Sequence, residues 1–146
     1  VITHLLRPKA DTRWLGFKEV RYEIGHFADA DGLTDYLLFL NALLPGVRYV
    51  INVRDPQTAA RSGWWREHPD AVSALERTVE HLGAAADTLT DVLGPGRVAL
   101  TEYEQWSADP SALVSALTSI GFPVQQALLR ESLATHLEHG QNSERR

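Results

Sequence analysis

The most regular hydrophobic pattern in the chain lies between Pro69 and Leu93. Apolar side chains recur there at alternating spacings of three and four positions, at Val72, Leu75, Val79, Leu82, Ala86, Leu89 and Leu93. This period places them along one side of an α-helix, which Gly94-Pro95-Gly96 should end. Because the stripe is close to the minimum length for a coiled coil, we expect it to pack within the chain's own domain. The alternative is an exposed surface that binds a partner.

Two short apolar runs predict buried strands. Residues 47–53 form one, in which Tyr49, Val50, Ile51 and Val53 make a nearly continuous apolar run that is typical of a strand in a sheet covered on both faces. Asp55 then suits the N-cap of a helix and Pro56 its first position, where the N–H that proline lacks would be unpaired. Residues 98–101 predict a further strand, followed by Glu102-Tyr103-Glu104 and then a loop before the next helix. A third strand is expected at residues 14–17.

Helix-capping and helix-breaking residues mark the ends of the remaining predicted helices. One helix, capped by Asp31 or Thr34, should run through Leu44 and stop at Pro45-Gly46. Its apolar side chains almost encircle it, so we expect it to be well buried. Two later helices are predicted, one over about 110–120 and, after a Gly-Phe-Pro break, one that runs to about residue 139.

The alternation of strands and helices indicates an α/β fold with a mainly parallel sheet flanked by helices. The 146 residues suit one domain. We assign residues 1–140 to this domain and the polar residues 141–146 to a flexible tail.

Composition narrows the function classes. The net charge of −5 argues against a nucleic-acid partner, and no apolar run approaches the roughly 20 residues that span a bilayer, so no membrane partner is expected. The chain has no cysteine, which excludes disulfides, thiolate catalysis and cysteine-bound zinc. A cytoplasmic location fits this composition. The histidines show no metal-ligand spacing, so we predict no metal.

The strand ends suggest where a ligand would bind. In parallel sheets, ligands sit beyond the carboxyl ends of the strands, which places Lys18, Arg54 and Tyr103 near one another. Arg54 is followed by a predicted helix that carries Ser62 eight positions later. A guanidinium, a hydroxyl and a helix N-terminus suit a phosphate group. The alternative is that Arg54 pairs with Asp55 or a neighbouring carboxylate and Ser62 is a surface residue.

Three segments together resemble the sulfotransferases that use 3′-phosphoadenosine-5′-phosphosulfate. Asn52-Val53-Arg54-Asp55-Pro56 with Ser62, preceded by Leu43-Leu44-Pro45-Gly46-Val47-Arg48, resembles the family's 3′-phosphate-binding strand and helix. Gly16-Phe17-Lys18-Glu19 resembles the strand end that bears its active-site lysine. Glu102-Tyr103-Glu104, Asp109-Pro110 and Gly121-Phe122-Pro123 resemble its C-terminal block. The segments occur in family order over about residues 14–125.

This resemblance implies a P-loop-NTPase-like three-layer fold and a role for each matching residue. Arg54 and Ser62 would hold the 3′-phosphate, and Tyr103 would contact adenine, although it could instead be a buried anchor of the sheet edge. Lys18 would stabilise charge on the leaving group. The reaction would transfer a sulfuryl group from the donor to a hydroxyl or amine of a small-molecule or glycan acceptor, leaving adenosine 3′,5′-bisphosphate, without a metal.

The chain departs from the family pattern at two points. Val20 stands where cytosolic members place a histidine, so the general base of the family has no counterpart at this position. Glu19, Glu23 and His26 are the candidates for this base, and Glu19 adjoins the lysine. No G-x-x-x-x-G-K-S/T loop occurs, and nothing before Lys18 is glycine-rich. We therefore expect a C-terminal portion that lacks the 5′-phosphosulfate loop and is inactive alone, or a degenerate module.

Two further possibilities follow from this expectation. An uncovered sheet edge would favour a homodimer formed by strand exchange, or pairing with a separate N-terminal half. The function class that competes with the enzyme is a non-catalytic α/β interaction module that binds through the amphipathic helix 69–93. It would expose the apolar stripe, whereas an enzyme must gather Lys18, Arg54, Ser62 and Tyr103 around one site.

Overall fold

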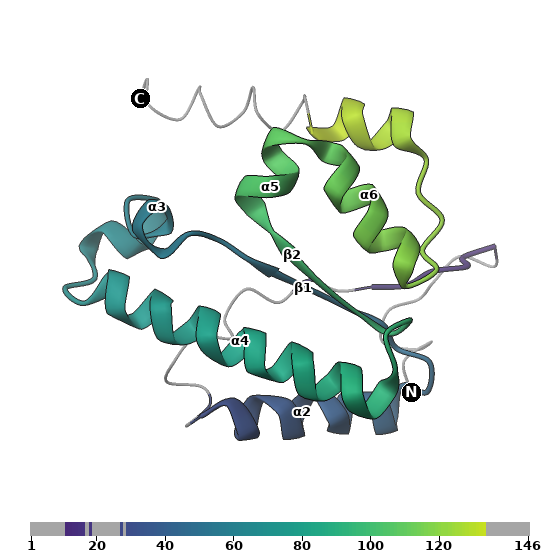
Figure 1. Ribbon diagram of the computed structural model, residues 1–146, viewed down its shortest axis with the longest axis horizontal. Helices are drawn as coiled ribbons and strands as arrows, with labels where there is room; N and C mark the ends of the chain where they lie inside the picture. The colour runs from purple at the N-terminus through teal and green to yellow at the C-terminus, as the bar shows by residue number, and fades with distance from the viewer. Residues whose placement is uncertain (1–10, 17, 19–26, 28, 134–146) are drawn as a thin grey trace.

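A computed structural model describes residues 11–16, 18, 27 and 29–133 of the chain. The elements follow one another as strands and helices in alternation (Figure 1). In chain order they are α2 (Ala30–Leu43), β1 (Tyr49–Val53), α3 (Pro56–Ala59), the 3-10 helix η1 (Gly63–Glu67), α4 (Ala71–Leu93), β2 (Val98–Glu102), α5 (Tyr103–Ala108) and α6 (Pro110–Ser119), and residues 126–133 are also helical.

The two strands form a parallel pair with helices on both sides. The register aligns Tyr49 with Val98 at one end and Val53 with Glu102 at the other. In Figure 1, α2 and α4 lie on one side of the strands and α5 and α6 on the other, and both α4 and α6 contact β2. The predicted α/β fold with parallel strands is therefore confirmed. The described residues form this two-stranded sheet and do not display the larger P-loop-NTPase-like arrangement that the resemblance implies.

The core lies between α4, α2 and one face of the sheet. Its most buried side chains come from the helices, Leu33 at 1% exposure and Leu89 at 0%, and Tyr49 and Ile51 of β1 pack with them. The hydroxyl of Tyr49 donates to the carbonyl oxygen of Leu37 at 2.6 Å, so its polar end is satisfied. Burial raises the pKa of Tyr49, which keeps the phenol neutral.

Helix α4 confirms the predicted amphipathic helix and its internal packing. Ala71, Ala74, Ala85, Ala86 and Leu89 are buried, and Leu82 and Leu93 pack partly buried against the core. The helix ends at Gly94, which has a φ of 91° that other residues rarely adopt. Because α4 packs against α2, α3 and both strands, its apolar stripe is used within the chain.

Helix α2 differs from the prediction in its cap and in its burial. The N-cap is Asp29, whose carboxylate accepts from the N–H of Gly32 at 2.9 Å. Thr34, one of the two predicted caps, instead donates to the carbonyl oxygen of Ala30 at 2.8 Å. Phe39 and Leu43 are 56% and 57% exposed, so the expectation of all-round burial was wrong. Only the side of α2 that faces α4 and Tyr49 is covered.

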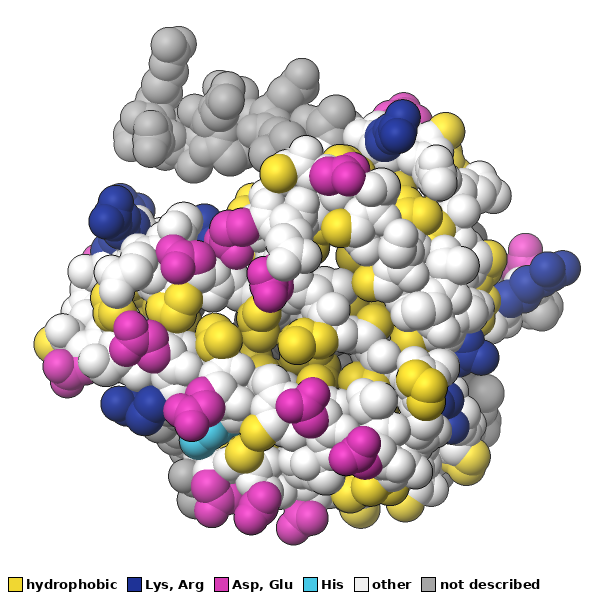
Figure 2. Space-filling view, in the orientation of Figure 1, with side chains coloured by type: hydrophobic (Ala, Val, Ile, Leu, Met, Phe, Trp, Pro, Cys, Tyr) yellow, Lys and Arg dark blue, Asp and Glu magenta, His cyan; other side chains and the backbone are white. Residues whose placement is uncertain are grey.

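Strand β1 is also less covered than its composition suggested. It begins at Tyr49 rather than Val47, and its burial alternates along the strand. Val50 is 44% exposed and Leu100 of β2 is 46% exposed. Because Val50 aligns with Ala99 and Leu100 with Ile51, these two side chains point to opposite faces of the sheet. Figure 2 shows apolar side chains at the surface between α4 and the α5–α6 pair, with acidic side chains around them.

Two further segments depart from their predicted structure. Residues 12–16 are not a strand; the Trp14 ring instead packs on Phe122 at 5.0 Å between centroids and lies under the guanidinium of Arg48 at 5.0 Å. The residues after β2 are not a loop, because α5 starts directly at Tyr103. The end of the last predicted helix, beyond residue 133, and Phe17 lie outside the described residues.

The far end of the sheet is tied to α2 by one arginine. Arg97 donates from Nε to the carbonyl oxygen of Val47 and from Nη2 to Oδ1 of Asn41, both at 2.7 Å. The Tyr49 N–H then donates to the carbonyl oxygen of Arg97 at 2.8 Å, which begins the strand pairing. These bonds set where β2 starts relative to β1.

In the described ranges, no helix has the length and apolar character needed to cross a bilayer.

We expect Leu89→Ala to lower the free energy of unfolding by about 2–5 kcal/mol, because it leaves a cavity between α4, α2 and the sheet. The exposed Leu43→Ala is the matched control and should change it by no more than about 0.5 kcal/mol. Urea denaturation of both variants would measure these values. Equal losses for the two variants would contradict the described core.

Candidate functional site

The carboxyl ends of β1 and β2 bring Arg54 and Tyr103 together. The register pairs Val53 with Glu102, so the next residue of each strand leaves the sheet at the same edge. The Arg54 guanidinium lies over the Tyr103 ring at 4.7 Å from its centroid. This is within the range of a cation–π contact. The prediction that these two residues are neighbours is confirmed.

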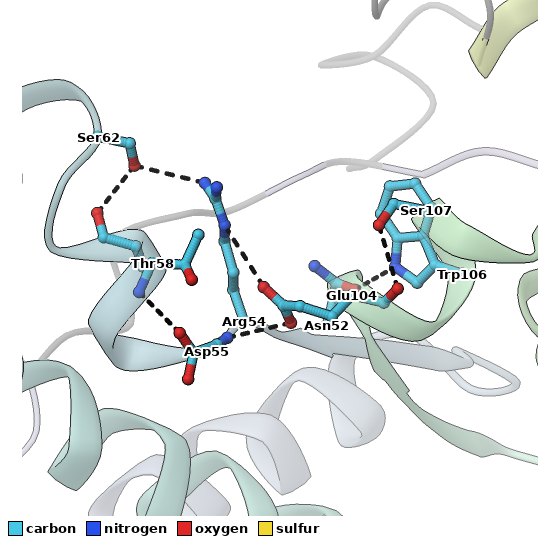
Figure 3. A network of polar contacts seen from close by, with 9 residues as sticks. Asn52, Arg54, Asp55, Thr58, Ser62, Glu104, Trp106 and Ser107 are labelled. Carbon is cyan, nitrogen blue, oxygen red and sulfur yellow. Dashed lines mark hydrogen bonds and ion pairs between the residues drawn. The ribbon is translucent and has the colours of Figure 1, made fainter.

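Ser62 returns to Arg54 after a single helical turn. The carboxylate of Asp55 accepts from the N–H of Thr58 at 2.7 Å and Pro56 occupies the first turn, as predicted for α3. Arg54 Nη1 then donates to Ser62 Oγ at 3.4 Å, and the Ser62 hydroxyl donates to the carbonyl oxygen of Ala59 at 2.8 Å (Figure 3). The eight-residue spacing from Arg54 to Ser62 therefore places the serine hydroxyl oxygen beside the guanidinium.

A carboxylate from α5 occupies another edge of the same guanidinium. Glu104 Oε1 lies 3.7 Å from Arg54 Nε, and Glu104 Oε2 accepts from the N–H of Asp55 at 3.1 Å. The ion pair is too long for a hydrogen bond, which explains why the buried Nε has no hydrogen-bond partner. Arg54 thus pairs with a neighbouring carboxylate and also contacts Ser62. The carboxylate pairing agrees with the alternative interpretation of this arginine, and phosphate binding by Arg54 and Ser62 stays a prediction.

The guanidinium has donors beyond those it uses here. Arginine carries five N–H donors, and the one hydrogen bond of this side chain to another described residue is the long contact to Ser62. The Arg54 side chain is 36% exposed and Glu104 43% exposed, so their attraction is partly screened by water. The Nη groups therefore keep N–H donors that no described residue uses.

A second network joins the strands just before the site. Asn52 Oδ1 accepts from the Thr101 hydroxyl at 2.9 Å and from Trp106 Nε1 at 2.8 Å. The rings of Trp106 and Tyr103 meet edge to face with centroids 4.8 Å apart. Asn52 therefore fixes α5 against the strands and holds Tyr103 under Arg54. Asn52 lies within the sequence motif that contains Arg54, but its hydrogen bonds to Thr101 and Trp106 could not be predicted without knowing the register of the two strands.

The predicted catalytic pair is not joined to these residues. Lys18 is exposed, and within the described residues no hydrogen bond, ion pair or ring contact connects it with Arg54, Ser62 or Tyr103. Glu19, like the other base candidates Glu23 and His26, lies outside the described residues. The structure therefore brings together Arg54, Ser62 and Tyr103, and leaves the position of Lys18 relative to them as a prediction.

A separate hollow of about 300 Å³ lies at the start of α4. Its lining comes from the end of α3, η1 and the first turn of α4, and includes Trp65, Arg66, His68 and Ser73 but not Arg54 or Tyr103. Trp65 is half-buried with its ring against His68 at 5.5 Å between centroids, consistent with a packing role. The Trp64 side chain lies outside the described part of the structure.

Comparisons with protein-family models, curated proteins and solved structures found no match to this chain. The structure also shows, within the residues it describes, no group of three or more metal-ligating side chains.

We predict that Asp55 contributes to stability in a pH-dependent way. Hydrogen bonds from Thr58 lower the pKa of Asp55 below its usual 3.8. A lowered folded-state pKa adds stability that is present above the unfolded pKa and is lost as the pH falls through the folded one. Asparagine keeps an acceptor for the cap but does not titrate.

The advantage of the wild type over Asp55→Asn should therefore be largest near neutral pH and shrink as the pH falls below about 4. Urea denaturation of both proteins between about pH 7 and about pH 2.5 would measure it. Asp109, whose pKa is lowered in the same way by Ser111, provides a second test through Asp109→Asn. A difference between wild type and Asp55→Asn that is constant across this range would exclude the proposed linkage.

Proposed function

We propose that the end of β1 and the segment through Ser62 bind the 3′-phosphate of a nucleotide, and that the chain acts in sulfuryl transfer from 3′-phosphoadenosine-5′-phosphosulfate. The observation that carries this proposal is the Arg54 guanidinium with Ser62 Oγ 3.4 Å from its Nη1 and an aromatic ring beneath it. Two Nη groups can donate to the oxygens of one phosphate, and the Ser62 hydroxyl can join them by turning its proton away from the Ala59 carbonyl oxygen.

Tyr103 and Trp106 support a nucleotide rather than a bare anion. Both rings are half-buried; Tyr103 lies against the guanidinium and Trp106 lies against Tyr103, so a base attached to a bound phosphate would meet aromatic surface. The Arg54 contact covers one face of Tyr103, so the adenine would use the remaining exposed surface of this ring. Tyr103 also holds the guanidinium in place through the cation–π contact.

The proposed reaction passes a sulfuryl group to a hydroxyl or amine of a small-molecule or glycan acceptor. Lys18 would stabilise charge on the departing phosphate oxygen, and Glu19 could accept the proton of the acceptor. The chemistry relies on placement and charge and needs no metal. In this proposal the two-stranded sheet belongs to a larger P-loop-NTPase-like layer. The glycine-rich loop for the 5′-phosphosulfate is not in the sequence, so the 3′-phosphate site is the part that can be tested directly.

The alternative, an interaction module that uses the 69–93 helix, requires an exposed apolar stripe. Of the stripe residues, Leu89 is fully buried and Ala86 is 3% exposed, and the others are half-buried. The packing of α4 against α2 and the sheet therefore counts against the interaction module.

Calorimetric titration with adenosine 3′,5′-bisphosphate tests the proposal. We expect weak, salt-sensitive binding by the wild type. Arg54→Ala should reduce the affinity by at least about tenfold, because hydrogen bonds to charged groups contribute about 1.5–3 kcal/mol. Ser62→Ala should reduce it by less, roughly two- to tenfold, because the hydroxyl must give up its bond to the Ala59 carbonyl oxygen in order to donate to the phosphate.

Arg77→Ala is the matched control, since this arginine is exposed on α4 and its removal changes the net charge equally. It should bind almost as well as the wild type. The absence of binding by a folded wild type at millimolar ligand would overturn the proposed function, as would equal losses for Arg54→Ala and Arg77→Ala.

A further inference from the structure

Glu104 is the one acidic side chain that the described structure places on the Arg54 guanidinium. Its two carboxylate oxygens have separate contacts, with Oε1 3.7 Å from Arg54 Nε and Oε2 accepting from the Asp55 N–H at 3.1 Å. Figure 3 shows Glu104 and Ser62 approaching Arg54 from different segments, Glu104 from α5 and Ser62 from the connection between α3 and η1. Glu104 therefore occupies the Nε edge, whereas Ser62 lies at the Nη edge.

A phosphate on the Nη edge would share one cation with Glu104. The guanidinium carries a single positive charge, so a carboxylate at its Nε edge already offsets part of the attraction that an incoming anion would feel. The two anions would also repel each other directly. Because Arg54 and Glu104 are both more than one-third exposed, this repulsion is moderated by solvent and by salt.

We propose that Glu104 is a resident counter-ion that limits the affinity of this site for phosphorylated ligands. The inference rests on the proposed function and deepens it, because it assigns the control of affinity to a residue outside the phosphate-binding pair. The contact with the Asp55 N–H holds Glu104 in place without needing its charge, since a neutral amide oxygen can accept the same bond. A substitution by glutamine can therefore remove the charge of Glu104 and keep the side chain in its position.

Glu104→Gln should bind adenosine 3′,5′-bisphosphate about two- to fivefold more tightly than the wild type at low salt, the scale of exposed charge pairs. This gain in affinity over the wild type should decrease as the salt concentration rises. Glu102→Gln is the matched control, because it removes the same charge two residues earlier from a side chain that bonds Gln105 instead. The affinity of Glu102→Gln should rise less than that of Glu104→Gln. Adenosine, which lacks phosphate, should bind both Gln variants and the wild type alike.

The measurement is calorimetric titration of the four proteins, wild type, Glu104→Gln, Glu102→Gln and Arg54→Ala, at low and high salt. Equal or weaker binding by Glu104→Gln, or an equal gain from Glu102→Gln, would overturn the counter-ion role while leaving the proposed function intact if Arg54→Ala still loses binding. If neither the wild type nor Glu104→Gln binds the bisphosphate, the proposed function fails and this inference fails with it.

Discussion

The parallel pairing of β1 with β2 is the constraint on which the candidate site depends. The chain contributes Arg54 and Tyr103 from segments that are far apart in sequence, and the alignment of Val53 with Glu102 makes them neighbours. A slip of one residue would turn alternate side chains to the other face of the sheet. It would also separate Asn52 from Thr101, whose hydrogen bond belongs to the network that holds α5.

Several contacts away from the site maintain this register. Arg97 bonds the α2–β1 connection at the opposite end of the strands, and α4 covers both strands with small and apolar side chains. Between these anchors, the site is assembled from short-range features: an Asp-Pro start to α3, a single turn, and a helix that begins directly after β2. The stability of the core and the geometry of the Arg54 region are therefore linked through the strand pair.

The sequence predicted the elements with strong local signals. The period of α4, the Asp55-Pro56 helix start and the proximity of Arg54 to Ser62 all follow from spacing and cap chemistry. What it missed depends on tertiary contacts. The Asp29 cap, the exposed face of α2 and the hydrogen bonds that Asn52 accepts depend on how elements pack and align. Glu104 was visible in a motif, but only the strand alignment shows that it reaches Arg54.

The most direct test of the Arg54–Ser62–Tyr103 site is an NMR titration of the full chain with adenosine 3′,5′-bisphosphate. The amide signals of residues 54–62 and 103–106 should shift together and saturate with one affinity, and the Arg54 side-chain signal should move with them. Shifts concentrated at residues 65–73, around the hollow at the start of α4, would place the ligand elsewhere. Shifts of that kind, or none at all, would contradict the assignment of this strand edge as the phosphate site.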